Sequence, residues 1–242
     1  MGTALIDLRS MIKERSRTDE VLSSAWLAAP LIAVALGIAA GLLYMPGLGA
    51  AEVFIFIVFG AEVAALVIQA MLIYKLVRRR SLHFRRDAAL REALIKYVQQ
   101  LASSLGKETE VTVELATMNT IHSEAKAEEP WKGPVLWALL SIFIPFAILY
   151  VLYFLTKDPP RHDRRQSSFL QQAQSALSKL GKPVVYPSWR QLPERSFFLY
   201  LVLTIITGFF ALYWYYVLIK DLNEHFKAQW VFEDELLRAV GS

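Results

Sequence analysis

The chain has no cysteine among its 242 residues. This absence excludes disulfides, thiolate metal sites and cysteine nucleophiles. Signatures of common enzyme classes are missing too: there is no P-loop, no G-x-S-x-G, no H-E-x-x-H and no Rossmann glycine fingerprint. We therefore expect no catalytic residues, no enzymatic activity and no cofactor. A basic surface with a nucleic-acid reader element is also lacking, so nucleic acid is not an expected partner.

Apolar residues are in excess instead. Hydrophobic residues make up 55% of the chain, whereas soluble domains have about 45–50% even with glycine counted. They concentrate in four blocks, each near the roughly 20 residues that span a bilayer. The blocks cover 25–44, 53–74, 134–156 and 197–219. This pattern predicts an all-α, multi-pass integral membrane protein of a prokaryotic plasma membrane, with both termini on the cytoplasmic side.

The composition shifts along the chain divide it into five parts. A short Pro/Gly-rich link between the first two blocks predicts a transmembrane helical hairpin. The segment before it has apolar residues at helical spacing and could lie on the membrane surface. After the hairpin we expect a cytoplasmic helix that ends near residue 105 with Gly106 as its C-cap, a short strand at 110–115 and an acidic loop. The five parts are 1–24 (amphipathic segment), 25–76 (hairpin), 77–130 (helix and acidic loop), 131–182 and 183–242 (two units, each an apolar segment followed by an amphipathic helix).

The last two parts read as copies of one unit. A shift of 63 aligns 149–169 with 212–232, and nine of the 21 positions are identical. A weaker match at a shift of 142 adds the end of the second apolar block. The three copies place His83, His162 and His225 at one position of the unit. Three imidazoles around a pseudo-threefold axis could meet at a metal ion, but no acid stands at a fixed ligand spacing in all three copies, so we expect no metal.

Each repeated apolar block carries a helix-weakening residue at its centre, Pro145 or Gly208. If both blocks span the membrane, the basic segments at 78–91 and 157–195 fall on opposite faces, against the positive-inside rule. If each block folds back at its centre as a re-entrant hairpin, all basic segments share the cytoplasmic face. Such a turn at depth requires other protein to cover its backbone groups. Both alternatives stay open.

The stretch TIITGFFALYWYYVLIKDLNEH at 204–225 carries a recognisable pattern. It resembles an uncharacterised family of small prokaryotic membrane proteins, a domain of unknown function. Members share Thr-x-x-Gly-aromatic, an aromatic pair with Trp, and a basic residue before Asp-Leu-Asn. Thr204, Gly208, Trp214, Lys220 and Asp221 carry the match, with Gly208 one place later than in the pattern. The resemblance implies a prokaryotic membrane protein and no particular activity.

Glu62 is the one carboxylate within an apolar block, and Gln69 lies two turns further along the same helix face. An ionised carboxylate at membrane depth is costly, so a proton or cation site is one hypothesis. The alternative is a hydrogen-bonded Glu that fixes helix contacts.

Basic and aromatic residues next to the apolar blocks are predicted to contact anionic lipid headgroups. They are Arg78, Arg79, Arg80, Arg85, Arg86, Lys157, Lys220 and Trp214. We expect a non-catalytic scaffold, an accessory subunit of a membrane assembly or a bilayer-organising protein. Its expected partners are the anionic bilayer and other membrane subunits or further copies of itself. The alternative function is a small transporter or ion-channel subunit that uses Glu62.

Overall fold

The computed structural model describes residues 2–28, 31–32, 35, 38–39, 51–144, 146–185 and 189–241. Every regular element in these ranges is helical, which confirms the all-α prediction. The elements are α1 (Gly2–Lys13), α2 (Arg15–Thr18), η1 (Ser24–Leu27), α4 (Ala51–Leu105), η2 (Glu108–Val111), α5 (Thr112–Glu128), α6 (Pro134–Phe143), α7 (Ala147–Lys179), α8 (Phe197–Thr207) and α9 (Phe210–Gly241).

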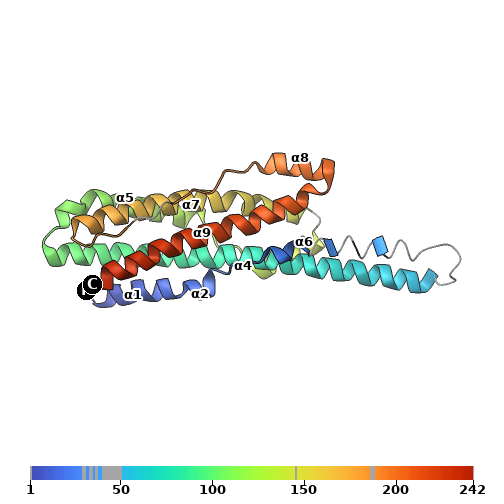
Figure 1. Cartoon of the computed structure of the whole chain (residues 1–242), viewed down its shortest axis with the longest axis horizontal. Helices are drawn as coiled ribbons and strands as arrows, with labels where there is room; N and C mark the ends of the chain where they lie inside the picture. Colours follow the sequence, from blue (N-terminus) through green and yellow to red (C-terminus); the bar gives the residue numbers. More distant parts are fainter. Residues whose placement is uncertain are drawn as a thin grey trace.

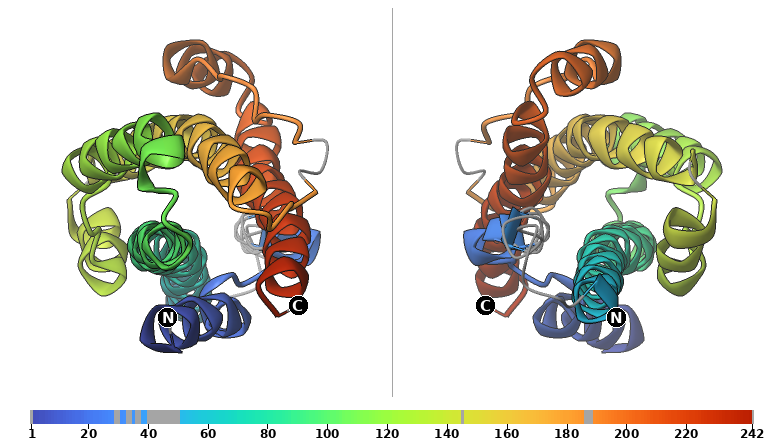
Figure 2. Two further views of the ribbon diagram at one scale, coloured as in Figure 1. Left: turned by 90° about the vertical axis from the view of Figure 1, so that its left-hand side faces the viewer. Right: turned by 90° about the vertical axis from the view of Figure 1, so that its right-hand side faces the viewer.

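The long helix α4 is the axis of the molecule (Figure 1). Its C-terminal half packs against α7 and α9, while α1 and α5 cover outer sides of this bundle (Figure 2). Its N-terminal half extends past every other labelled helix. Both chain termini lie at the opposite end (Figure 1).

Buried side chains form three layers along the bundle. One apolar cluster lies toward the chain termini and includes Leu94, Leu177 and Leu236. A second apolar cluster lies toward the extended N-terminal part of α4 and includes Leu72 and Trp214. The segments between them hold the buried charged residues of α4, α7 and α9. A polar layer thus separates two apolar ones.

The N-terminal segment is amphipathic, and its apolar face lies inside the bundle. Ala4, Leu8 and Ile12 are buried in the first apolar cluster, and α1 packs mainly on α4. The idea that this face rests on a membrane surface is therefore wrong, because protein already covers it.

The expected strand at 110–115 and the acidic loop after it are helical, as η2 and α5. Val111, Met118 and Ala125 recur every seven residues and are all fully buried. This spacing is a helical stripe, which the acidic residues between these positions obscure. Glu114 adds an ion pair to Lys179 on α7.

The glycines after α4 and α7 cap these helices, as predicted for Gly106. Gly106 and Gly181 have φ of +64° and +78°. The amide that follows each glycine donates to a carbonyl five residues back, Ala102 or Leu177. This bond defines the Schellman motif, which favours glycine because only glycine adopts positive φ without strain.

The helices on either side of each predicted break pack against each other, α6 against α7 and α8 against α9. Trp137 on α6 contacts Phe154 on α7 across the turn (ring centroids 5.6 Å apart), and Phe197 on α8 contacts Trp214 on α9 (5.6 Å). Gly208 ends α8 with φ of +65°, so its predicted role as a helix breaker is confirmed. Pro145 lies outside the described residues.

One helix among the described residues is long and apolar enough to cross a membrane, the stretch Val58–Leu105 of α4; α6 and α8 are shorter apolar helices. More than half of the first apolar block and most of the link to the second lie outside the described residues, and so does the turn of the predicted hairpin; the second block lies within α4.

Candidate metal centre

Three helices bring the repeat-position histidines to one point inside the polar layer. His83 comes from α4, His162 from α7 and His225 from α9, and all three are buried. Asp87 lies one turn after His83 on the same face of α4. One ligand atom from each of these four residues lies within 4.8 Å of the other three.

The Nε2 atoms of the histidines face one another and Asp87. His83 Nε2 lies 2.9 Å from His225 Nε2, and His162 Nε2 lies 3.0 Å from Asp87 Oδ2. His83 Nε2 is 3.6 Å from the same oxygen. Three ring nitrogens and one carboxylate oxygen therefore converge inside the bundle.

The other ring nitrogen of each histidine faces a carboxylate. His83 Nδ1 lies 2.9 Å from Asp19 Oδ1, and His225 Nδ1 lies 2.6 Å from Asp163 Oδ1. His162 Nδ1 lies 3.1 Å from Glu129 Oε1.

An ionised carboxylate only accepts hydrogen bonds, so the Nδ1 atoms of His83 and His225 carry the protons of their pairs. His162 Nδ1 lies at ion-pair distance from Glu129 Oε1 but makes no hydrogen bond to it in this geometry. The Nε2 of a neutral imidazole then presents a lone pair to the common centre. In proteins, this carboxylate–histidine arrangement is typical of metal ligands, because the carboxylate fixes the tautomer and orients the ring.

Asp87 is held with one oxygen left for the centre. Its Oδ1 accepts from Gln229 Nε2 (2.5 Å) and from Arg86 Nη2 (3.2 Å). Its Oδ2 faces the histidines. The partners of Oδ1 thus orient the carboxylate without occupying the converging atom.

Further contacts fix the outer carboxylates. Asp163 accepts from the indole of Trp189 (2.9 Å) and from the backbone amide of Leu192 (2.8 Å). Asp19 accepts from the indole of Trp230 (2.8 Å). These bonds bring two segments far from the histidines in sequence, around 19 and 189–192, into the site.

Aromatic rings cover the imidazoles. Phe84 stacks on His162 with ring centroids 4.0 Å apart and planes 15° apart. Phe226 lies 4.5 Å from His83. Each phenylalanine follows a histidine of the cluster directly in sequence, so a ring of one helix covers an imidazole of another. This cover keeps bulk water away from the centre.

Burial and charge set the protonation of the site. Burial lowers the pKa of His83 to about 4 despite its acidic neighbours, so this ring is neutral at pH 7. Burial alone would raise the pKa of Asp19, but His83 and Arg86 beside it outweigh burial and lower its pKa to about 2. Burial also opposes ionisation of Glu129, but His162, Arg91 and Arg165 outweigh it and lower the pKa of Glu129 to about 2.

The pKa of Asp87 also lies well below its ordinary value, because His83, His162 and Arg86 together outweigh burial. For His162 burial favours the neutral ring, yet Glu129 and Asp87 raise its pKa above the ordinary value. The carboxylates around the centre are thus ionised at neutral pH.

Several side chains predicted to contact lipid headgroups lie inside the protein instead. Arg79 donates to Asn223 and to the Ile219 carbonyl. Arg80 pairs with Asp158 at 2.6 Å. The helices α7 and α9 cover this side of α4, which turns a basic cluster that looks surface-bound in sequence into buried contacts.

The prediction that Arg86 and Trp214 contact lipid headgroups is wrong for the same reason. Arg86 pairs with Glu233 at 2.6 Å and with Asp19 at 3.1 Å, and the Trp214 indole donates to Thr156. Both side chains are buried and cannot reach headgroups. Of the remaining residues in this prediction, Arg78 pairs with Glu20 and Lys220 with Glu224; Arg85 and Lys220 are exposed and Lys157 is partly exposed.

The two intramembrane polar candidates have different surroundings. Gln69 donates to the hydroxyl of Tyr215 on α9, so it fixes a helix contact. Glu62 is exposed on α4, and no hydrogen bond or ion pair to it occurs within the described ranges. The two residues do not form one site.

Sequence reasoning aligned the three histidines but missed the acids beside them. The expectation of no metal required an acid at the same spacing in every copy. In the structure each acid has a different origin: Asp87 is one turn from His83, Asp163 adjoins His162, and Asp19 and Glu129 follow α2 and α5. The His83–Asp87 spacing was a usable signal; the contributions of Asp19 and Glu129 depend on tertiary packing.

Comparison of the chain with protein-family models, with curated proteins and with solved structures finds no match in any of the three. The resemblance of 204–225 to a family of prokaryotic membrane proteins stays a prediction. The function must therefore be argued from the site.

Proposed function

We propose that this protein is a non-catalytic, membrane-anchored metal-binding protein, in which one divalent first-row transition-metal ion joins α4, α7 and α9. One observation carries the proposal: three imidazole Nε2 atoms and Asp87 Oδ2 converge while all three Nδ1 atoms face carboxylates.

The proton count supports a cation at this point. With each Nδ1 protonated, His83 and His225 turn lone pairs toward each other at 2.9 Å. His162 turns its lone pair toward the Asp87 oxygen at 3.0 Å. Two extra protons, or one divalent cation, relieve these contacts. The raised pKa of His162 favours a proton on the His162–Asp87 contact, whereas a single metal ion relieves both contacts at once.

The donor set favours zinc among the candidate ions. Neutral imidazole suits zinc, copper, iron and nickel, whereas magnesium and calcium prefer oxygen. Four protein donors complete the usual coordination of structural zinc, and catalytic zinc keeps a position open for water. His83, Asp87, His162 and His225 are all buried, which supports a structural role and no catalysis.

The membrane part of the proposal rests on exposed apolar side chains. Phe146 at the α6–α7 turn and Phe209 at the α8–α9 turn are 77% and 81% exposed. Both turns lie on the side of the bundle from which the apolar half of α4 extends (Figure 1). We infer that α4 crosses the bilayer and that the two hairpins re-enter the near leaflet.

This arrangement leaves the metal-binding bundle and both termini on one side of a prokaryotic plasma membrane. The basic residues that follow the apolar part of α4 favour the cytoplasmic side. The bundle is then a rigid cytoplasmic platform, consistent with a scaffold or an accessory subunit of a larger assembly. The alternative of a transporter or channel subunit using Glu62 gains no contact from the described residues and stays a prediction.

Metal analysis of the purified chain tests the proposal. The protein is expressed with a tag that contains no histidine, extracted in mild detergent and analysed for bound metals by mass spectrometry. We expect about one metal ion per chain and a lower melting temperature after chelation. His162→Ala removes the ion. His122→Ala is the matched control, because His122 is the one histidine outside the cluster, on α5. Folded wild-type protein without metal, and unchanged by chelator, contradicts the proposal.

A further inference from the structure

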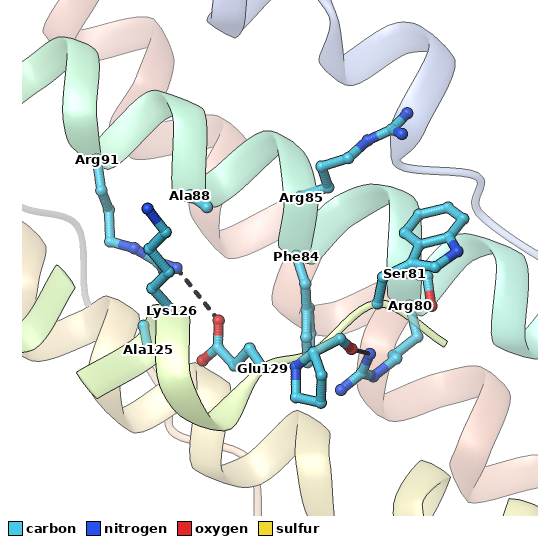
Figure 3. A pocket seen from close by; sticks show the side chains of 11 residues that line it. Arg80, Ser81, Phe84, Arg85, Ala88, Arg91, Ala125, Lys126 and Glu129 are labelled. Atoms are coloured by element: carbon cyan, nitrogen blue, oxygen red, sulfur yellow. Dashed lines mark hydrogen bonds and ion pairs between the residues drawn. The ribbon is translucent and has the colours of Figure 1, made fainter. Parts of the chain in front are cut away.

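A basic cavity lies beside the metal centre, between α4, the end of α5 and the turn into α6 (Figure 3). It has a volume of about 330 Å³, within the size range of small-ligand sites. Four cationic side chains line it, together with a single carboxylate, Glu129. The cationic residues are Arg80, Arg85, Arg91 and Lys126.

The four cations divide into a fixed pair and a free pair. Arg80 is buried, pairs with Asp158 and donates to the Pro130 carbonyl. Arg91 is buried and donates to Gln166 and Glu129. The Nε of each of these arginines is buried and has no hydrogen-bond partner among the described atoms. Unpartnered donors of this kind, in a cavity wall, call for an acceptor.

The free pair lies at the rim. Arg85 and Lys126 are exposed, and neither forms an ion pair with a carboxylate in the part of the chain that the structure describes. The Arg85 guanidinium lies over the Trp131 ring, 5.0 Å from its centroid. The rim thus presents two uncompensated positive charges and one exposed indole.

The one acid does not cancel this charge. Glu129 Oε2 accepts from Arg91, and Oε1 accepts from Arg165 and faces His162. Both oxygens are engaged by the metal-centre side of the wall. The cavity therefore keeps a net positive character toward its opening.

The opening lies where the chain enters the proposed membrane hairpin. Ser81 at the cavity donates to the Lys132 carbonyl, and α6 begins two residues later at Pro134. Trp131, half exposed, belongs to the residue type that concentrates at the headgroup level of membranes. Arg80 follows the last residue of the apolar block by six positions, about 9 Å along a helix. A phospholipid headgroup can reach this opening from the near leaflet.

We propose that this cavity binds the phosphate of an anionic phospholipid, with Arg85 and Lys126 as the contacting cations and the Trp131 indole at the headgroup level. Anionic headgroups bind basic pockets beside membrane helices on the cytoplasmic side. The proposal rests on the membrane part of the proposed function and does not require the metal. A free phosphate or phosphate ester has the same recognition chemistry, so the test separates the two sources.

Native mass spectrometry of the full-length protein in detergent tests the site. Phosphatidylglycerol, phosphatidylcholine and glycerol 3-phosphate are each titrated onto wild-type protein. We expect one saturable phosphatidylglycerol, at least tenfold preference over phosphatidylcholine, and no competition by glycerol 3-phosphate at equal concentration. Arg85→Gln combined with Lys126→Gln lowers phosphatidylglycerol affinity about tenfold.

The matched control removes the same two charges elsewhere. Arg9→Gln combined with Lys96→Gln changes one exposed arginine on α1 and one exposed lysine on the distal part of α4, and its affinity stays within twofold of wild type. Equal weakening by both double variants, or glycerol 3-phosphate binding in place of the lipid, overturns the lipid assignment.

A separate vesicle-binding assay tests the membrane anchor. Wild-type protein that keeps its metal but fails to bind vesicles of any composition points to failure of this anchor. Loss of metal with normal lipid selectivity points to the metal centre. The two failures are therefore distinguishable from failure of the cavity proposal.

Discussion

At the end of the molecule that carries the hairpin turns, apolar side chains point outward, whereas in the middle of the bundle charged side chains point inward. Phe209 is 81% exposed, and His83 and Asp87 are fully buried. In water each arrangement costs free energy. In the proposed function a bilayer removes the first cost. In the polar layer a dense network of ion pairs, together with the proposed metal ion, offsets the second.

The largest effect is expected from breaking the charge network around the centre. Arg86→Leu leaves Glu233, Asp19 and Asp87 without their common buried cation. Removing one partner of a buried pair costs about 3–5 kcal/mol. We expect a loss of this size in the free energy of unfolding, measured by chemical denaturation in detergent. Arg238→Leu is the control, because Arg238 is exposed and its one ion pair among the described residues is with Glu235; equal losses would contradict the role of the layer.

The hairpin end is tested by a charge at its tip. Phe209→Asp places a carboxylate where the proposed hairpin enters lipid; such a charge costs about 2.5–3.5 kcal/mol at the centre of a membrane helix. We expect weaker membrane association and nearly unchanged stability in detergent. Val113→Asp changes an equally exposed apolar residue on α5 and leaves membrane association unchanged. Flotation of the two variants with vesicles separates these outcomes.

Glu233 gives the polar layer a pH dependence. Burial raises the pKa of Glu233 from 4.5 to about 7, with Asp87 adding to the effect and Arg86 and Gln229 opposing it. Between pH 4.5 and 7 the unfolded chain is ionised at this position, while the folded chain holds the proton. Stability from this group is therefore present below about pH 4.5 and declines as pH rises toward 7.

The variant Glu233→Gln cannot ionise and lacks this decline. Between pH 5 and pH 7.5 the free energy of unfolding of the variant is expected to rise by about 2–3 kcal/mol relative to that of wild type, since each pKa unit corresponds to about 1.4 kcal/mol. A difference between wild type and variant that is the same at both pH values would show that Glu233 does not titrate in this range.

The smallest effect concerns an outer carboxylate. Asp163→Asn keeps the shape of the side chain but weakens the acceptor for His225 Nδ1. Loss of such a partner lowers metal affinity about 10–100-fold. Competition with a metal-binding dye measures this change. Asp158→Asn removes an acid of the same layer that pairs with Arg80 rather than with a histidine, and its metal affinity should equal that of wild type.

The sequence predicted the helical class, the glycine cap at Gly106 and the break at Gly208. It also aligned the three histidines, but predicted no metal site for them. Each of these depends on local spacing or on one residue type. The position of Asp19 and Glu129 could not be predicted, because it depends on how α2 and α5 pack against α4 and α7.

The fate of the basic cluster shows the same limit. Arg79, Arg80 and Arg86 follow an apolar block and look like interface residues in sequence. Only the packing of α7 and α9 on that face shows that they are interior partners. The helical stripe of α5 was hidden for a related reason, since its fully buried positions are seven residues apart and acidic residues lie between them.

In the proposed function a metal ion holds the three histidines together. X-ray absorption at the metal edge, recorded on wild-type protein purified from membranes without a histidine tag, reports the number and type of its ligands. We expect one ion per chain with three imidazole nitrogens and one carboxylate oxygen as ligands. Folded protein with no bound metal, or metal surrounded by water oxygens alone, would contradict it.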